Sequence, residues 1–150
     1  MKLALFESEI QELVFNTLES DSTLVGYLGG DASDKRIYLA WPDSGEITIS
    51  DLKPAYIVIE TMPAEAPVKI GSGIDDWAQR YCLHVFANPD ERELRGNIEE
   101  RFRLQFHRKK FVTTSYILYQ VYEDGKEDVM DDGGLLDHKY FLMFKFLIRN

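Results

Sequence analysis

The chain contains 150 residues, of which 45% are apolar and 29% charged, a composition that suits one hydrophobic core and excludes wholesale disorder. We therefore expect a single domain over residues 1–150. The net charge of -9 repels a phosphate backbone, so direct binding of nucleic acid is not expected. The lone cysteine, Cys82, allows no internal disulfide, offers no cysteine-based zinc site and fits a reducing compartment such as the cytoplasm.

The sequence gives no sign of export or of a membrane span. Glu7 and Glu9 interrupt the weakly apolar start before the apolar core of a signal peptide would be complete. No apolar stretch approaches the ~20 residues that a spanning helix needs, since even Tyr140 to Ile148 contains Lys145. We expect a soluble protein without a membrane partner.

The first elements are expected to be helical. Apolar residues at helical spacing predict a helix from about Ser8 to Glu19, and Ser8 with Gln11 has the form of a capping box. A second short helix is expected to end at Leu28, because Gly29-Gly30 can supply left-handed backbone conformations. The residues that can cap this second helix are Asp21 or Ser22.

Two β-like runs follow. Arg36 to Trp41 alternates between apolar and polar residues until a proline stops it, which predicts a short strand. Tyr56 to Thr61 is nearly continuous in apolar and β-branched residues, which predicts a central strand covered on both faces. The segment between them, Asp43 to Lys53, can form a minor strand or remain a loop.

The prolines and glycines of Met62 to Asp76 predict a long irregular connection, a type of segment that often carries an interaction. Its candidate contact residues are Lys69, Asp75 and Asp76. Gln79 to Ala87 then alternates strictly and predicts a strand. One face of that strand carries Arg80, Cys82, His84 and Phe86.

Asn88-Pro89-Asp90-Glu91 predicts the start of a helix, with Asn as N-cap, Pro at the first position and Glu at the third. We expect this helix over about residues 89–110, with one apolar face on a sheet. Arg108, Lys109 and Lys110 then fall in the last turn, where cations complement the helix dipole. Binding of a phosphate backbone by these residues together with Arg101 and Arg103 is the weaker alternative.

Two aromatic strands, Ser115 to Tyr122 and His138 to Ile148, end the chain. The second has one wholly apolar face and one mixed face, which indicates a second covering surface, either a helix of the same chain or a neighbouring subunit. Asp124-Gly125 and the segment Asp131 to Gly134 are equally good candidates for the turn between the strands.

The segment from Glu123 to Asp137 is strongly acidic. Its spacing does not match a calcium loop, so we interpret it as a solvated hairpin tip or an electrostatic contact with a partner. A basic helix end, Arg101 to Lys110, and this acidic loop can serve as complementary faces in a head-to-tail ring, or can pair within one subunit. The acidic candidates for contact are Glu123, Asp124, Glu127, Asp128, Asp131 and Asp132.

The histidines offer no recognisable catalytic arrangement. Cys82 and His84 share a strand face two residues apart, but neighbouring side chains on one face point in parallel. We therefore expect a buried cysteine and a histidine with its hydrogen bonds satisfied. No catalytic, metal-binding or cofactor-binding residue is assigned.

Several segments together resemble the tail-completion, or tail-terminator, proteins of long-tailed (siphovirus-like) phages and prophages. Leu18 to Gly26, followed by Arg36-Ile37 and a strand that ends at a proline, resembles the helix, the leucine-valine-glycine turn and the first strand of that family. The later strands and helix of the family resemble, in the same order, Tyr56 to Glu60, Trp77 to Ala87, the helix with Leu94 and Ile98, and His138 to Ile148. The likeness spans nearly the whole chain and rests on element order and hydrophobic pattern.

The resemblance implies an α+β subunit, in which an N-terminal helix and the central helix pack on a mainly antiparallel sheet. It implies a homo-hexameric ring at the head–tail junction of a virion, assembled in the host cytoplasm, with the tail-tube protein and the head-completion or connector protein as partners. Such proteins are not enzymes, so the resemblance implies no catalytic residue and no cofactor. Two other classes stay open: a small metal-dependent hydrolase that uses Asp128, Asp131 and Asp132, and a cytoplasmic protein-binding adaptor.

Overall fold

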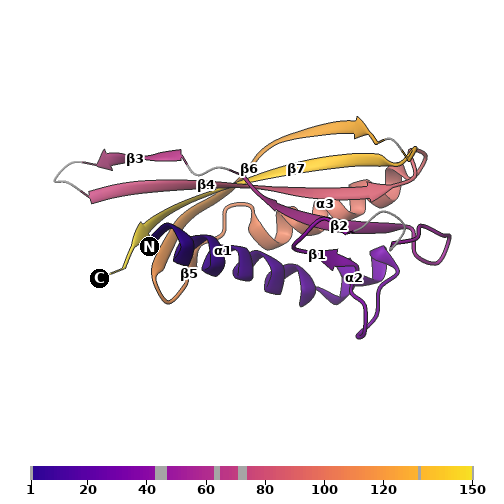
Figure 1. The fold of residues 1–150 in the computed structure, drawn as a ribbon, viewed down its shortest axis with the longest axis horizontal. Helices are drawn as coiled ribbons and strands as arrows, with labels where there is room; N and C mark the ends of the chain where they lie inside the picture. The colour runs from indigo at the N-terminus through magenta and orange to yellow at the C-terminus, as the bar shows by residue number, and fades with distance from the viewer. Residues whose placement is uncertain (1, 43–46, 63–64, 71–73, 132, 150) are drawn as a thin grey trace.

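The computed structural model is an α+β fold in which three helices lie against one face of a twisted sheet (Figure 1). The helices are α1 (Lys2–Glu19), α2 (Ser22–Leu28) and α3 (Arg92–Phe106). None of the helices in the described part of the chain combines the length and apolar character needed to span a bilayer. The structure describes residues 2–42, 47–62, 65–70, 74–131 and 133–149.

The sheet is mainly antiparallel, with the strand order β1-β2-β4-β7-β6-β5 and with β3 paired to the early part of β4. Only the pair of β1 with β2 is parallel among the described strands. The predicted fold class is therefore confirmed. The strands are β1 (Ile37–Tyr38), β2 (Ala55–Thr61), β3 (Glu65–Ile70), β4 (Ile74–Ala87), β5 (Phe111–Val112), β6 (Tyr116–Met130) and β7 (Leu136–Ile148).

The core fills the space between the helices and the face of the sheet that they cover. Alternation in β4 and β7 directs large apolar side chains to this inner face, because successive residues of a strand point to opposite sides. The expected apolar face of the last strand is confirmed in this way. Fully buried residues from these strands include Tyr81, Leu83, Val85, Tyr140, Leu142, Phe144 and Phe146.

The two N-terminal helices differ in how well their ends were predicted. α1 begins at Lys2, so Ser8 lies inside the helix and the predicted capping box is wrong. The reason is that Leu3, Ala4 and Leu5 are strong helix formers and extend the helix towards the N-terminus. α2 has the predicted ends: its N-cap is Asp21, and Gly29 closes it with φ 75°, whereas Gly30 does not adopt a positive φ.

The strand predicted from Arg36 to Trp41 is shorter than expected, since β1 covers only Ile37–Tyr38. The described part of the following segment, residues 47–53, is a loop, and residues 43–46 lie outside the described residues. The buried guanidinium of Arg36 donates to the carbonyls of Thr48, Lys53 and Ala55, at 3.0, 3.3 and 2.8 Å. Because this guanidinium binds two carbonyls of the loop and one of β2, it holds the loop against the start of β2.

β2 confirms the predicted strand with two covered faces, but its position is wrong. Ile57, Val58 and Ile59 are all buried, although successive residues face opposite sides. β2 lies next to the two-residue edge strand β1 and is not central. The centre of the sheet is formed by β4 and β7, which pair from Trp77 with Phe146 to Ala87 with Leu136.

The irregular connection predicted for Met62 to Asp76 is instead largely a β-hairpin. β3 pairs antiparallel with the start of β4, and the hairpin projects beyond the helices (Figure 1). Pro67 lies where the register shifts between Glu65 and Val68, because a proline is tolerated in an edge strand at an irregularity. Pro63, Gly71 and Gly73, which suggested the irregular connection, lie outside the described residues.

Both predicted ends of the central helix are wrong. A turn closed by a hydrogen bond from Glu91 N–H to the Asn88 carbonyl precedes α3, so the helix begins at Arg92 and Asn88 does not cap it. The Arg95 side chain donates to the carbonyl of Asn88 at 3.0 Å and stabilises this turn. At the other end the helix stops at Phe106, and Arg108 adopts a left-handed φ of 62° while its N–H bonds to β6.

The turn between the last two strands lies at Asp131 to Gly134, where the Asp131 side chain accepts a hydrogen bond from Leu135 N–H at 2.8 Å. Asp124-Gly125 lies inside β6, at a register shift where Gly125 has φ 105°. Glu127 to Met130 therefore extends the hairpin arm, one of the two expected alternatives. A bulge with a glycine at positive φ explains why the same dipeptide resembles a turn in the sequence.

Candidate functional site

The predicted contact residues fall into separate regions of the fold, and several have partners within the chain. Arg101, on α3, binds the buried carboxylate of Asp21 with Nε–Oδ2 2.8 Å and Nη2–Oδ1 3.1 Å. Gln105 donates to the same carboxylate at 3.1 Å. Burial alone would raise the pKa of Asp21, but these bonds and the one from Leu24 N–H outweigh it and lower that pKa.

Glu123 lies on the helical side of β6 and does not belong to a solvated loop. Its carboxylate accepts a hydrogen bond from Arg103 Nε at 2.8 Å and from the Tyr140 hydroxyl at 3.1 Å. Burial raises the pKa of Glu123, but the bond from Arg103 is the main opposing cause and the net pKa is lowered. Burial, assisted by Glu123, raises the pKa of Tyr140. This ion pair fixes α3 on β6 and is the intrachain alternative that the sequence left open.

Other acidic residues of the predicted loop also bind within the chain. Asp124 pairs with Arg80 at 3.0 Å on the outer face of the sheet, which is the face away from the helices. Asp128 binds Nδ1 of His138, and Nε2 of His138 faces Glu99 at 3.3 Å. Glu127 is exposed, and Asp132 lies outside the described residues. The acidic run is thus a strand arm and a turn rather than one loop.

We call Glu127, Asp128 and Asp131 the acidic hairpin end, and Arg108, Lys109 and Lys110 the basic segment. The basic segment is exposed and follows the C-terminal end of α3, where it lines one side of a hollow of about 410 Å³ with Tyr119 to Tyr122. Asp131, in the acidic hairpin end, lies near the other end of α3, because Leu136 pairs with Ala87 just before the helix begins.

The basic segment follows the C-terminal end of α3, whereas the acidic hairpin end extends from the middle of the helix, where His138 lies between Asp128 and Glu99, towards its start. α3 has 15 residues, and at 1.5 Å per residue it spans about 22 Å. A single subunit therefore presents the basic segment and the acidic hairpin end on separate parts of its surface. The remaining predicted contacts, Lys69, Asp75 and Asp76, belong to the β3–β4 hairpin. Lys69 lies opposite Asp75 in the backbone register of the two strands, and the side chains of all three residues lie outside what the structure describes.

On the outer face, Cys82 and His84 are buried as expected, with 1% and 3% of their surface exposed. His84 Nδ1 donates to the Asp137 carboxylate at 2.9 Å, and Nε2 donates to Glu60 Oε1 at 2.9 Å. Burial alone would lower the pKa of His84, but hydrogen bonds with Asp137, Cys82 and Glu60 raise that pKa to about 10. Trp41 lies across the imidazole, with ring centroids 4.7 Å apart.

Sequence reasoning missed the partners of His84. In the sequence Asp137 belongs to the acidic run, although it is buried at the start of β7, and Glu60 is only one residue of a predicted strand. These residues are distant in sequence from His84, and only the register of three neighbouring strands brings them together. An alternating pattern reports which face a residue occupies but not what lies beside it on the next strand.

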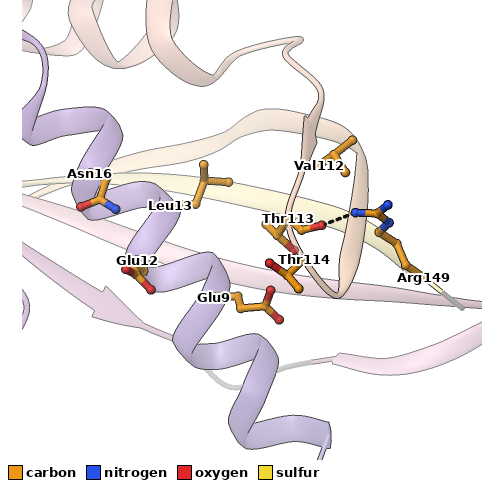
Figure 2. A pocket seen from close by; sticks show the side chains of 8 residues that line it. All are labelled: Glu9, Glu12, Leu13, Asn16, Val112, Thr113, Thr114 and Arg149. Carbon is orange, nitrogen blue, oxygen red and sulfur yellow. Dashed lines mark hydrogen bonds between the residues drawn. The ribbon is translucent and has the colours of Figure 1, made fainter.

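A polar hollow of about 470 Å³ lies between α1 and the β5–β6 turn (Figure 2). Arg149 donates to the Thr113 carbonyl at 2.8 Å across one side, and Glu9 accepts from Ser115 N–H at 3.1 Å. The hollow therefore lies where α1 meets the end of β7. Its lining residues are Glu9, Glu12, Leu13, Asn16, Val112, Thr113, Thr114 and Arg149, a set without histidine or cysteine.

No protein-family model and no curated protein matches the sequence. Among solved structures, a chain of the virion of a native gene transfer agent particle superimposes with a TM-score of 0.69. The match covers 94% of this chain and 96% of that chain at 11% sequence identity. The two chains share a fold. Because the match covers nearly both whole chains, helices and sheet together belong to it, but a shared fold does not by itself assign a function.

Proposed function

We propose that this protein is a non-enzymatic structural subunit of a phage-like virion, and more specifically a tail-terminator subunit at the head–tail junction. The observation that carries the proposal is the fold shared, over 94% of the chain, with a protein of a gene transfer agent virion. The resemblance in element order to tail-terminator proteins rests on the sequence alone, so it supports the same conclusion independently of the structure.

A closed ring, with six subunits as in the family, is the proposed assembly. A head-to-tail ring needs two different surface patches on each subunit that fit each other. The basic segment and the acidic hairpin end meet this need, because they carry opposite charge and lie on separate parts of the surface: Arg108 bonds to Val121 of β6, and the acidic residues lie further along that strand and in the turn that follows it. A contact between them joins one subunit to the next and cannot form inside one subunit.

The outer face of the sheet supplies a second argument for neighbours. The helices of the described residues all lie on the inner face, whereas Phe141 and Leu147 of β7 are only half-buried on the outer face. Arg80 lies over the Phe141 ring at 4.1 Å and gives this ring a partial polar cover. We propose that other virion subunits complete the cover, with the tail-tube protein and the head connector as the partners.

The acidic net charge of -9 is compatible with this position, because like-charge repulsion lets DNA pass a ring lumen without sticking. Sedimentation velocity and native mass spectrometry, with and without purified tail-tube protein, test the proposal. We expect a closed oligomer and its complex with the tube. A protein that stays monomeric at high concentration with tube protein present would contradict it.

A further inference from the structure

The outer face of the sheet holds a mixed group of donor atoms that the assembly role does not use. Glu60 and Cys82 are directly opposite each other on β2 and β4, and His84 follows on the same face of β4. A carboxylate oxygen of Glu60, Sγ of Cys82 and a ring nitrogen of His84 all lie within 4.8 Å of one another. Two of the three residues are buried. We propose that Glu60, Cys82 and His84 bind a zinc ion, in contrast to the expectation from the sequence that the lone cysteine offers no zinc site.

The donor set selects the metal. A thiolate, an imidazole and a carboxylate are the three ligand types of protein zinc sites, and they coordinate zinc at about 2.0 to 2.3 Å. Magnesium and calcium prefer oxygen ligands only, so the sulfur and nitrogen donors count against them. Three protein ligands leave one of the four tetrahedral positions for water.

Asp137 supplies the outer partner that such a histidine needs. Its carboxylate holds Nδ1 of His84 at 2.9 and 3.1 Å, and this leaves Nε2 facing Glu60. Histidines that bind metals almost always donate their other ring N–H to a carboxylate or carbonyl, which fixes the ring and increases its basicity. Asp137 is buried and comes from β7, so the orientation of the imidazole is set by the sheet itself.

The charge and the surroundings of the group also suit a cation. Two carboxylates bind His84, which can offer at most one positive charge to them. Trp41 and Phe86 pack on the imidazole, with ring centroids at 4.7 and 6.0 Å, and shield the group from water on that side. The Glu60 side chain is 40% exposed, so a metal can enter from its side. Zinc replaces the proton on Nε2 and the thiol proton, and both protons are released to solvent.

The experiment uses the whole protein, stripped with a chelator and then titrated with zinc chloride or cobalt chloride. We expect one saturable site by calorimetry, and a thiolate-to-cobalt charge-transfer band by absorption spectroscopy. Magnesium chloride should give no saturable heat. Cys82→Ser should abolish the cobalt band, and Glu60→Gln and Asp137→Asn should each weaken zinc binding by roughly 10- to 100-fold.

His138→Gln is the matched control, because His138 also lies between two carboxylates, Asp128 and Glu99, but has no thiol beside it. Zinc affinity should not change in this variant. Glu60 is half-exposed, so Glu60→Gln keeps the test valid if the buried variants unfold. Absence of saturable zinc binding, or zinc binding that is unchanged in Cys82→Ser and in Glu60→Gln, overturns the proposal. Loss of the site in His138→Gln does so as well.

Discussion

Asp21 and Arg101 lie 80 positions apart in the sequence and form a bidentate ion pair that joins α2 to α3. The same carboxylate is the N-cap of α2, through a bond of 3.2 Å from Leu24 N–H. A buried acid thus starts one helix and anchors the other. Arg101, which the sequence indicated as a contact residue, has this internal partner, whereas Lys109 and Lys110 remain exposed.

Asp21→Ala is expected to destabilise the protein by about 2 to 3 kcal/mol, because it removes a helix cap and breaks a largely buried pair. Its side chain is only 2% exposed, so water cannot replace the lost bonds without opening the helical layer. Chemical denaturation followed by circular dichroism measures the change. Arg92→Ala, at an exposed position of the same helix, is the control and should lie within about 0.5 kcal/mol of wild type.

The stability of the protein should depend on pH because Asp21 and Glu123 titrate differently in the folded and unfolded states. The pKa of Asp21 and that of Glu123 are lowered in the folded state from ordinary values of 3.8 and 4.5. A carboxyl whose pKa is lower when folded stabilises the fold above its unfolded pKa, and this stability is lost as pH falls through the folded pKa. We expect the thermal midpoint to fall steeply below about pH 4.5.

Asp21→Asn separates this effect from general acid unfolding. The variant keeps a side-chain oxygen for the cap but cannot titrate, so its midpoint should depend less on pH between about 2 and 4.5 than that of wild type. The measurement is a series of melting curves across this range. Parallel curves for the two proteins would show that Asp21 does not contribute.

Replacement by alanine should have opposite effects on stability at Gly26, inside α2, and at Gly29, which caps the same helix. Gly29 closes α2 with φ 75°, and a Cβ there would lie 2.1 Å from the Leu52 carbonyl oxygen. Gly29→Ala should therefore cost about 2 kcal/mol or more, from backbone strain and from displacement of the loop that holds Leu52. A Cβ added at Gly26 would meet no neighbouring atom within 4 Å, so Gly26→Ala should stabilise the protein by about 0.4 to 1 kcal/mol. Denaturant midpoints of the two variants should move in opposite directions.

Sequence patterns predicted the elements whose ends depend on residues that are close together in the chain. Asp21 and Gly29 marked both ends of α2, because a side-chain cap and a left-handed glycine act within a few residues. Strict alternation predicted β4, although the strand begins earlier, at Ile74. The order and type of the main elements can therefore be predicted from the sequence, and the family resemblance rests on these two properties.

Tertiary contacts decided what the sequence did not predict. Asn88-Pro89 resembles a helix start, but the Arg95 side chain holds the carbonyls of both residues and keeps them in a turn. Pro67 suggested an irregular segment, but an edge strand can accept it at a register shift. The group around His84 depends on the register of β2, β4 and β7, for which an alternating pattern gives no information.

The ring proposal makes a prediction about charge reversal. Lys109→Glu with Lys110→Glu makes the basic segment acidic, and Glu127→Lys with Asp128→Lys makes the acidic hairpin end basic. Each double variant then presents like charges at the proposed contact, so each should fail to form a closed oligomer in sedimentation velocity. Glu12→Lys reverses an exposed charge on α1, away from both patches, and should leave the oligomer intact.

Mixing the two double variants in equal amounts should restore the oligomer. The altered basic segment of one variant then meets the altered hairpin end of the other, and the two unaltered patches also meet, so the subunits alternate around the ring. Alternation closes only with an even number of subunits, and six satisfies this condition. Native mass spectrometry should show equal numbers of both variants in each restored ring. Assembly that stays lost in the mixture would place the subunit contact on other surfaces, because charge complementarity had been restored at this one.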